Sequence, residues 1–145
     1  MQSATDIQLH LRCTSCGATN RVPAARIDEA PNCGRCGVPL LSGQVLELSD
    51  ADFDAVAAAT RLPLLVDFWA PWCGPCRTMA PAFEQAAQKL ARRALLVKVN
   101  SDDNPRLSQQ FAIRSIPTLV RLDSGRETQR QSGVLPASAI MAMIG

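Results

Sequence analysis

An apolar segment that ends just before a Cys-Gly-Pro-Cys motif constrains the fold of this chain more than any other feature. Residues 64–70 read Leu-Leu-Val-Asp-Phe-Trp-Ala, a run with the length and composition of a buried strand. Cys73 and Cys76 follow, and a helix-forming tract continues to Arg93. The sequence therefore predicts a strand-to-helix junction with Cys73 at the start of the helix. Unpaired amides and the positive end of the helix dipole there favour a thiolate, the reactive form of cysteine.

Strands and helices are expected to alternate from Gln44 onward. Periodicity and turn formers predict strands at residues 44–48, 64–70, 94–99, 118–122 and 127–133, and helices at residues 51–60, 73–93, 105–111 and 136–144. A kink is expected at Pro81 in the longest helix. Such alternation is typical of an α/β domain whose central sheet is covered on both faces.

The segment before this α/β domain, residues 9–42, has too few apolar residues to hold a fold by themselves. It also has no long stretch in which apolar residues repeat at helical spacing. Four of the six cysteines form two loops of the form Cys-x-x-Cys-Gly in this segment: Cys13, Cys16, Cys33 and Cys36. Sixteen residues separate the two pairs, a spacing typical of zinc sites built from four thiolates. We therefore predict a metal-binding module in residues 1–43 and an α/β domain in residues 44–145.

The metal predicted for these cysteines is zinc. Four thiolates around one divalent ion complete a tetrahedron and leave no position for water or substrate, so the site is expected to be structural. Iron in a rubredoxin-like site is the alternative, because iron accepts the same ligands and the sequence does not separate the two metals. Two disulfides or free thiols are a further interpretation, although neither needs two matched loops. His10, the only histidine, is expected to be a surface residue.

Composition and charge argue against two classes of partner. The chain has 145 residues and a formal net charge of +2, without a Lys/Arg run of the kind that follows a phosphate backbone. Its apolar stretches are far shorter than the roughly 18 residues that a helix needs to span a membrane. Residues 1–11 lack the basic start and the apolar core of a signal peptide. We expect no nucleic-acid or membrane partner and a cytoplasmic location. In that reducing compartment, six cysteines point to metal binding and catalysis rather than to structural disulfides.

The segment from Val66 to Cys76, VDFWAPWCGPC, resembles the active-site segment of the thioredoxin family. The likeness continues, in the family's order and spacing, at Lys98, Asn100, Asn104, Pro105, Phe111, residues 113–118, Gly125 and Gly133. The two Cys-x-x-Cys-Gly loops, residues 13–17 and 33–37, are called the knuckles from here on. With the knuckles added, the whole chain resembles the zinc-containing second thioredoxins of bacteria. The resemblance implies a thioredoxin fold, a central mixed sheet flanked by helices, behind a small zinc-ribbon-like module.

Cys73 and Cys76 are the expected redox pair. Cys73, predicted to be exposed at the helix start, would attack a substrate disulfide as a thiolate and form a mixed disulfide. Cys76, one turn further and less accessible, would then attack Cys73, release the substrate and leave a Cys73–Cys76 disulfide. In this superfamily the intervening dipeptide, here Gly74 and Pro75, tunes the reduction potential. It resembles that of strongly reducing members, which implies a protein-disulfide reductase.

Asp67 is a carboxylate inside an apolar strand, where burial without a partner would cost several kcal/mol or raise its pKa. In thioredoxins the matching acid lies beneath the active site, so the resemblance implies that Asp67 is the general acid/base for Cys76. A carboxylate at a strand edge, paired with Lys98 on the next strand, is the other interpretation. The pairing with Lys98 is compatible with both.

A substrate surface is expected around Cys73. Pro117 stands just before a predicted strand, and the resemblance implies that the Ile116–Pro117 bond is cis and that the backbone of Ile116 is free to bind an extended substrate segment. Four residues would form the surface: Trp72, Ile116, Pro117 and Gly133. A core position is the alternative for Trp72, whereas Trp69 is expected to pack beneath the motif.

The resemblance also implies two kinds of partner, disulfide-containing protein substrates and an NADPH-dependent flavoprotein thioredoxin reductase. Two other functions stay open for the N-terminal knuckles. They can act as a redox sensor, in which oxidation of the four cysteines ejects the metal. They can also act, with or without the Trp72 surface, as a docking module for a partner protein.

Overall fold

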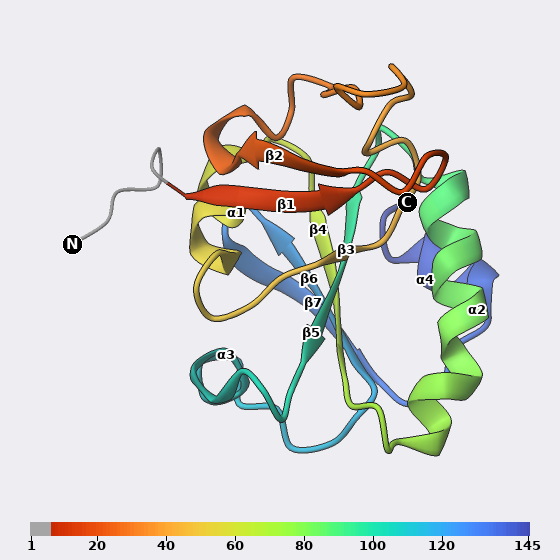
Figure 1. The fold of residues 1–145 in the computed structure, drawn as a ribbon. Helices are drawn as coiled ribbons and strands as arrows, with labels where there is room; N and C mark the ends of the chain where they lie inside the picture. Colours follow the sequence, from red (N-terminus) through yellow and green to blue (C-terminus); the bar gives the residue numbers. More distant parts are fainter. Residues whose placement is uncertain (1–6) are drawn as a thin grey trace.

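A five-stranded mixed sheet forms the centre of the computed structural model, which describes residues 7–145 (Figure 1). In spatial order its strands are β3 (Leu46–Glu47), β5 (Leu95–Asn100), β4 (Leu64–Trp69), β6 (Thr118–Asp123) and β7 (Arg126–Ser132). β3 and β4 run parallel to β5, whereas β6 is antiparallel to β4 and β7 is antiparallel to β6. The apolar run at residues 64–70 therefore supplies the central strand.

Helices cover both faces of the sheet, as the alternation of elements predicts. α1 (Phe53–Ala59) and α3 (Pro105–Gln110) lie on one side, and α2 (Gly74–Lys89) and α4 (Ala137–Ala142) lie on the other (Figure 1). α2 contains Pro81, and the kink expected there stays a prediction. Of the helices formed by residues 7–145, none is both long enough and apolar enough to cross a membrane.

Two buried cores separate the helices from the sheet, because successive side chains of a strand point to opposite faces. Val66 of β4 packs with Phe53 and Leu107 in a cluster that we call the α1-side core. Leu65, the preceding residue, packs with Met79 of α2 in the α2-side core. Burial on both faces explains why the sequence of β4 is almost continuously apolar.

Several elements are shorter than their sequence patterns predict, among them β3 and α2. β3 has two residues, although a strand is predicted for residues 44–48. The side chain of Gln44 donates a hydrogen bond to Oγ1 of Thr14 (3.2 Å). The chain at Gln44 is therefore bonded to the N-terminal module and is not paired with β5. α2 ends at Lys89, short of its predicted end, because the chain turns and Arg92 takes a left-handed φ of 68° that an α-helix cannot continue through.

An antiparallel hairpin, β1 (Gln8–Arg12) and β2 (Thr19–Pro23), begins the N-terminal module, and a 3₁₀ segment, η2 (Ala24–Arg26), follows it. The apolar side chains of the module do not form a core of their own. Leu9, Ile27 and Leu40 are buried in the α1-side core together with residues of α1. The module boundary predicted at residue 43 stays a prediction, and residues 1–6 of the predicted module lie outside the described residues.

Two contacts hold the module against the ends of α1 and α2. The carboxylate of Asp28 accepts hydrogen bonds from Oγ1 of Thr60 (2.7 Å) and from the amide of Arg61 (2.6 Å), just beyond α1. Gly43 has a φ of 89°, and a Cβ atom there would lie 2.9 Å from the Cα atom of Gln88 in α2. Only glycine fits this close approach without a shift of the backbone.

The shared core predicts that Leu40→Ala destabilises the whole chain and not only the module. Its side chain is 1% exposed, so truncation leaves a cavity and should lower the free energy of unfolding by about 2–5 kcal/mol. Val38→Ala is the matched control, because Val38 is 37% exposed and its loss should cost less than about 0.5 kcal/mol. Urea denaturation followed by circular dichroism measures both, and a Leu40→Ala curve that overlays the wild-type curve contradicts the shared core.

Candidate active site and metal centre

Cys73 and Cys76 lie where β4 leads into α2, and they form a disulfide with Cα atoms 5.2 Å apart. Cys73 is the N-cap residue of α2, and its Sγ accepts a hydrogen bond from the amide of Cys76 (3.2 Å). The amide of Cys73 donates to the carbonyl of Ala70 (3.1 Å). Gly74 and Pro75 begin the helix, where the missing amide of proline costs no hydrogen bond. The predicted strand-to-helix junction is confirmed.

The sulfur of Cys73 is enclosed, so the prediction that this cysteine is exposed is wrong for the disulfide form. Cys73 is 4% exposed and Cys76 is 1% exposed. Both pack with Ala70, and the side chains of Trp69 and Ile116 lie against the same cluster. Because both residues pack within this cluster, little of Cys73 reaches solvent. The predicted order of accessibility within the pair holds.

The loop before β6 lies beside the disulfide. The Ile116–Pro117 bond is cis, as predicted, and the carbonyl oxygen of the half-buried Ile116 lies 3.8 Å from Sγ of Cys73. Pro117 is buried, and its carbonyl accepts a hydrogen bond from the amide of Gly133 (2.9 Å). Gly133 is exposed and has a φ of 96°, which favours glycine. Three of the four residues predicted for the substrate surface are thus brought together.

Trp72, the fourth of these residues, is 68% exposed, so its interpretation as a core residue is wrong. Its Nε1 donates a hydrogen bond to the carboxylate of Asp102 (2.5 Å). The sequence prediction missed Asp102, because an acidic residue in a polar turn is an ordinary surface feature. The feature that could have identified Asp102 is the order of the strands in the sheet. β4 and β5 are parallel neighbours, so the residues that follow their carboxyl ends meet at one edge of the sheet.

Asp67 is fully buried in the central strand, between β5 and β6, so its interpretation as a strand-edge carboxylate is wrong. Neither carboxylate oxygen has a hydrogen-bond partner within residues 7–145. Burial raises the pKa of this carboxyl to about 7, against a smaller lowering by the charge of Lys98. Alternation along β4 places Asp67 on the face of Leu65, which packs against Met79 and Phe83 of α2. The carboxylate therefore faces the layer of the helix that carries Cys76.

Lys98 is the cross-strand neighbour of Asp67 on β5, but the two form no ion pair within the described part of the chain. Instead, Nζ of Lys98 lies 4.5 Å from the centroid of the Trp69 ring, a cation–π contact. Trp69 in turn packs against the cluster that contains the disulfide, as expected. The charge of Lys98 therefore acts on Asp67 through space while its side chain is held by the indole.

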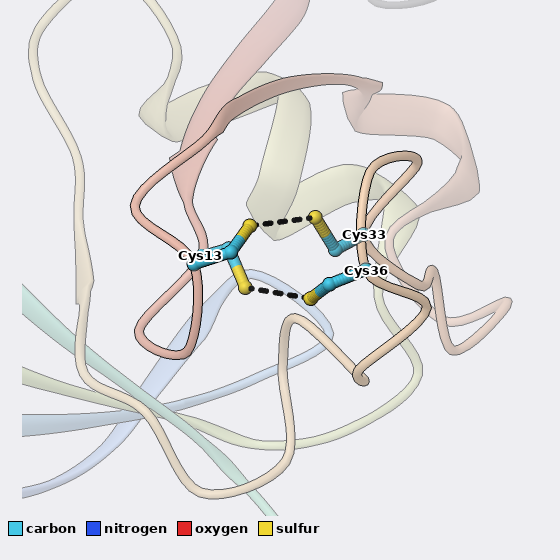
Figure 2. Close-up of side chains that lie close together, drawn as sticks. Cys13, Cys33 and Cys36 are labelled. Atoms are coloured by element: carbon cyan, nitrogen blue, oxygen red, sulfur yellow. Dashed lines mark hydrogen bonds between the residues drawn. The ribbon is translucent and has the colours of Figure 1, made fainter.

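The four knuckle cysteines also lie together, with their sulfurs all within 4.8 Å of one another: Cys13, Cys16, Cys33 and Cys36. Figure 2 shows Cys13 on the first knuckle facing Cys33 and Cys36 on the second. The Cys13–Cys36 and Cys16–Cys33 sulfur distances are both 3.6 Å. Around a tetrahedrally coordinated ion with metal–sulfur bonds of about 2.3 Å, the sulfur atoms lie about 3.8 Å apart. The sulfur–sulfur distances between the knuckles therefore fit such a site.

Both knuckles have the same backbone turn. Gly17 and Gly37 follow the second cysteine of each knuckle with φ values of 78° and 80°. Their amides donate to the carbonyls of Cys13 (2.9 Å) and Cys33 (2.8 Å). This left-handed conformation closes each loop and favours glycine, as the Cys-x-x-Cys-Gly pattern predicts.

Local hydrogen bonds and mutual proximity have opposite effects on the knuckle thiols. The amide of Cys36 and the side-chain amide of Asn20 lower the pKa of Cys33 to about 6. The amide of Val38 lowers the pKa of Cys36, but burial and the neighbouring thiols outweigh it and raise this pKa to about 11. Four thiolates at this separation would repel one another without a cation between them, and the donor set fits one divalent ion.

Comparison with known proteins gives two matches to family models and many similar sequences. The model described as Thioredoxin matches residues 44–145, and the model described as Thioredoxin 2, N-terminal, matches residues 12–38. The chain is 46% identical to Thioredoxin C-3 of Corynebacterium nephridii over 85% of this chain and 84% of that protein. It is 43% identical to Thioredoxin of Haemophilus influenzae over 70% of this chain and 94% of that protein.

Solved structures show the same likeness. A crystal structure of chloroplastic thioredoxin z superposes with a TM-score of 0.64 at 37% identity and covers 70% of this chain and 91% of that chain. A mutant thioredoxin from Halobacterium salinarum gives a TM-score of 0.65 at 28% identity, with 71% and 89% covered. Both matches extend over about the length of the α/β domain.

The titration of Asp67 predicts how stability depends on pH. The pKa of its carboxyl is 3.8 as an ordinary value and about 7 when folded, so folding takes up a proton between these values. The contribution of this group to the free energy of unfolding falls as the pH rises from about 4 to 7, by about 4 kcal/mol in total, and then levels off.

Asp67→Asn has no carboxyl to titrate and is the matched comparison. The stability of the variant minus that of the wild type should therefore rise across this window. Urea denaturation of both oxidised proteins at pH 4 to 8 measures the difference, and a difference that does not change with pH rules out the raised pKa.

Proposed function

Because this chain belongs to the thioredoxin family, and is thus a thiol-disulfide oxidoreductase that reduces protein disulfides, we propose that Cys73 is its nucleophile and Cys76 its resolving cysteine. The observation that carries the proposal is the Cys73–Cys76 disulfide at the N-terminus of α2. At this helix cap, the amide of Cys76 and the helix dipole favour a thiolate on Cys73 once the pair is reduced.

Two exchange steps account for the reaction. The thiolate of Cys73 attacks one sulfur of the substrate disulfide, which forms a mixed disulfide and expels the other substrate sulfur as a thiolate. The thiolate of Cys76 then attacks Sγ of Cys73, which closes the intramolecular disulfide and expels the second substrate sulfur. Two electrons pass from the protein to the substrate, and the two protons of the dithiol end on the two substrate thiols.

Asp67 is the proposed base that removes the proton of Cys76. A pKa of about 7 lets its carboxylate accept a proton near neutral pH, and its unpaired oxygens leave it free to do so. Its position on the face of β4 that α2 covers supports the assignment. The charge of Lys98 limits the rise of this pKa and so tunes the base, while Gly74 and Pro75 tune the reduction potential of the pair.

The proposed substrate surface consists of Trp72, Ile116, Pro117 and Gly133. Ile116 supports it most directly, because its carbonyl lies beside Cys73 and neither its amide nor its carbonyl takes part in a backbone hydrogen bond within residues 7–145. An extended substrate segment can pair with these free groups as an added strand would. Trp72, which precedes Cys73, is exposed and offers apolar contact, and the exposed Gly133 is bonded to the buried Pro117, which orders the loop.

Zinc is the proposed ion of the N-terminal module, held by the four knuckle cysteines. The size of the site, its complete set of sulfur ligands and the match of residues 12–38 to the Thioredoxin 2 N-terminal model support this ion, and iron is the alternative. Such an ion supplies a cross-link between the knuckles rather than catalysis, because four protein ligands leave no open position.

The placement of the module supports this structural role. It contacts α2 near Gln88, through Gly43, whereas the redox pair lies at the other end of that helix (Figure 1). At 1.5 Å per residue the two ends are about 20 Å apart. The first knuckle lies beside this contact, because Oγ1 of Thr14 accepts a hydrogen bond from Gln44 (3.2 Å). This conformation does not bring the knuckle cysteines to Cys73, which weighs against a metal-linked sensor that acts by direct exchange with Cys73.

The proposed partners are disulfide-containing proteins and an NADPH-dependent flavoprotein reductase that restores the dithiol. Family membership supports both. A cytoplasmic location is proposed from the cysteines, because four unpaired knuckle thiols and a reducing Gly-Pro motif suit a reducing compartment.

Cys73→Ser and Cys76→Ser test the two roles. With insulin as substrate and turnover followed by precipitation of its reduced chain, both variants should lose nearly all activity, because each step needs one of the two thiolates. Only Cys76→Ser should accumulate a mixed disulfide with insulin, visible on a non-reducing gel. Full turnover by either variant, or trapping by Cys73→Ser instead, contradicts the assignment.

Metal analysis tests the module. Protein purified under reducing conditions should contain about one zinc per chain, and Cys13→Ser should lose most of it because three thiolates hold the ion less tightly. His10→Ala is the control and should keep the full content, since His10 is exposed and outside the cluster. One iron per chain, or an unchanged zinc content in Cys13→Ser, shows that the proposed site is wrong.

A further inference from the structure

We propose that Asp102 is a positioning residue, which holds the indole of Trp72 in place for contact with protein substrates. The proposal rests on the substrate surface described above and adds a residue that neither the motif nor its spacing identifies. Asp102 lies in the turn after β5 and does not need to touch the substrate or the sulfurs. Its role is to reduce the freedom of the one large exposed side chain beside the disulfide.

Trp72 needs such support because little else holds its side chain. It is 68% exposed and belongs to none of the buried clusters formed by residues 7–145. The bond from its Nε1 to the carboxylate of Asp102 (2.5 Å) joins a neutral donor to a charged acceptor, a strong kind of hydrogen bond. This one contact therefore selects the orientation of the indole.

The turn that carries Asp102 is itself well anchored. The amide of Asp102 donates to Oδ1 of Asn100 (3.0 Å), and the amide of Ser101 donates to the carbonyl of Trp69 at the end of β4 (2.8 Å). The side chain of Asn104 donates to the carbonyl of Asn100 (2.9 Å). These bonds tie the turn to the ends of both β4 and β5, the edge of the sheet from which the redox motif begins.

A second set of bonds fixes the far side of the turn, where α3 begins, to Asp50 in the segment before α1. The amide of Asp50 donates to Oδ1 of Asn104 (2.8 Å). The carboxylate of Asp50 accepts from the amides of Leu107 (3.0 Å) and Arg106 (3.1 Å), which are otherwise free at the start of α3. A carboxylate held by an anchored turn can orient a mobile partner, whereas a carboxylate on a loose loop would move with it.

Ordering the indole before binding matters for large substrates only. A side chain that is already oriented loses less conformational entropy when a protein surface covers it. A small disulfide reagent needs access to the sulfur of Cys73 alone and does not cover the indole. The structure therefore predicts that Asp102 affects the rate with proteins and spares the rate with small disulfides.

The test compares two reactions of the reduced full-length protein, one with insulin and one with Ellman's reagent, each followed by stopped flow. Asp102→Ala should slow the reaction with insulin by about 2- to 10-fold and leave the reaction with Ellman's reagent within about 2-fold. Asp102→Asn should recover most of the insulin rate, because its amide oxygen still accepts the bond. Asp103→Ala is the matched control, since the Asp103 side chain has no hydrogen bond or ion pair within residues 7–145.

Two further measurements separate positioning from other effects. The indole N–H signal of Trp72 in a ¹⁵N spectrum should shift in Asp102→Ala, while that of Trp69 stays in place. Trp72→Ala should slow the insulin reaction, and Asp102→Ala should add nothing to it in the double variant, because Asp102 acts through the indole.

Three results would overturn the proposal. If Trp72→Ala slows insulin reduction and Asp102→Ala does not, the substrate surface stands and the positioning role fails. If neither variant slows it, the use of Trp72 as a substrate surface fails as well. If Asp102→Ala slows both reagents equally, Asp102 acts on the sulfur of Cys73 and not through the indole.

Discussion

The register of β4 within the sheet is the constraint on which the rest of the structure depends. Leu64 lies opposite Leu95 of β5 and Leu122 of β6, and this pairing decides which side chains face which layer. A shift by one residue would exchange the two faces of the strand. Asp67 would then lie in the α1-side core, away from the helix that carries Cys76. The same register brings the ends of β4 and β5 to one edge, where the disulfide and its neighbouring turn meet.

Burial of Asp67 shows how stability and chemistry oppose each other at this site. A carboxyl without a hydrogen-bond partner in the centre of a sheet costs folding free energy at neutral pH. The apolar contacts of the two cores offset that cost. Lys98 relieves it only in part, because its ammonium group is held over Trp69 and forms no ion pair with Asp67 within residues 7–145. The raised pKa that burial produces is the property that a base for Cys76 needs.

The cysteine pattern predicts one feature of the N-terminal module and not another. Two matched knuckles predict that Cys13, Cys16, Cys33 and Cys36 converge, and their sulfurs lie within 4.8 Å of one another. The pattern does not predict where the module sits. Its few apolar side chains, such as Leu40, enter the α1-side core, and it meets α2 at the end opposite the disulfide. Packing against distant elements decided that placement. The sequence pattern within the module cannot predict it, because the contacts are with residues far along the chain.

The sequence by itself determined the strand-to-helix junction at Cys73 and the form of both knuckles, because neighbouring residues within a few positions set strand burial, helix capping and loop closure. It also identified Asp67 as a buried acid from its apolar surroundings. Only the tertiary structure decided the enclosure of Cys73, the contact of Lys98 with Trp69 and the bond between Trp72 and Asp102. The last two join residues about thirty positions apart, and the parallel pairing of β4 with β5 brings them together.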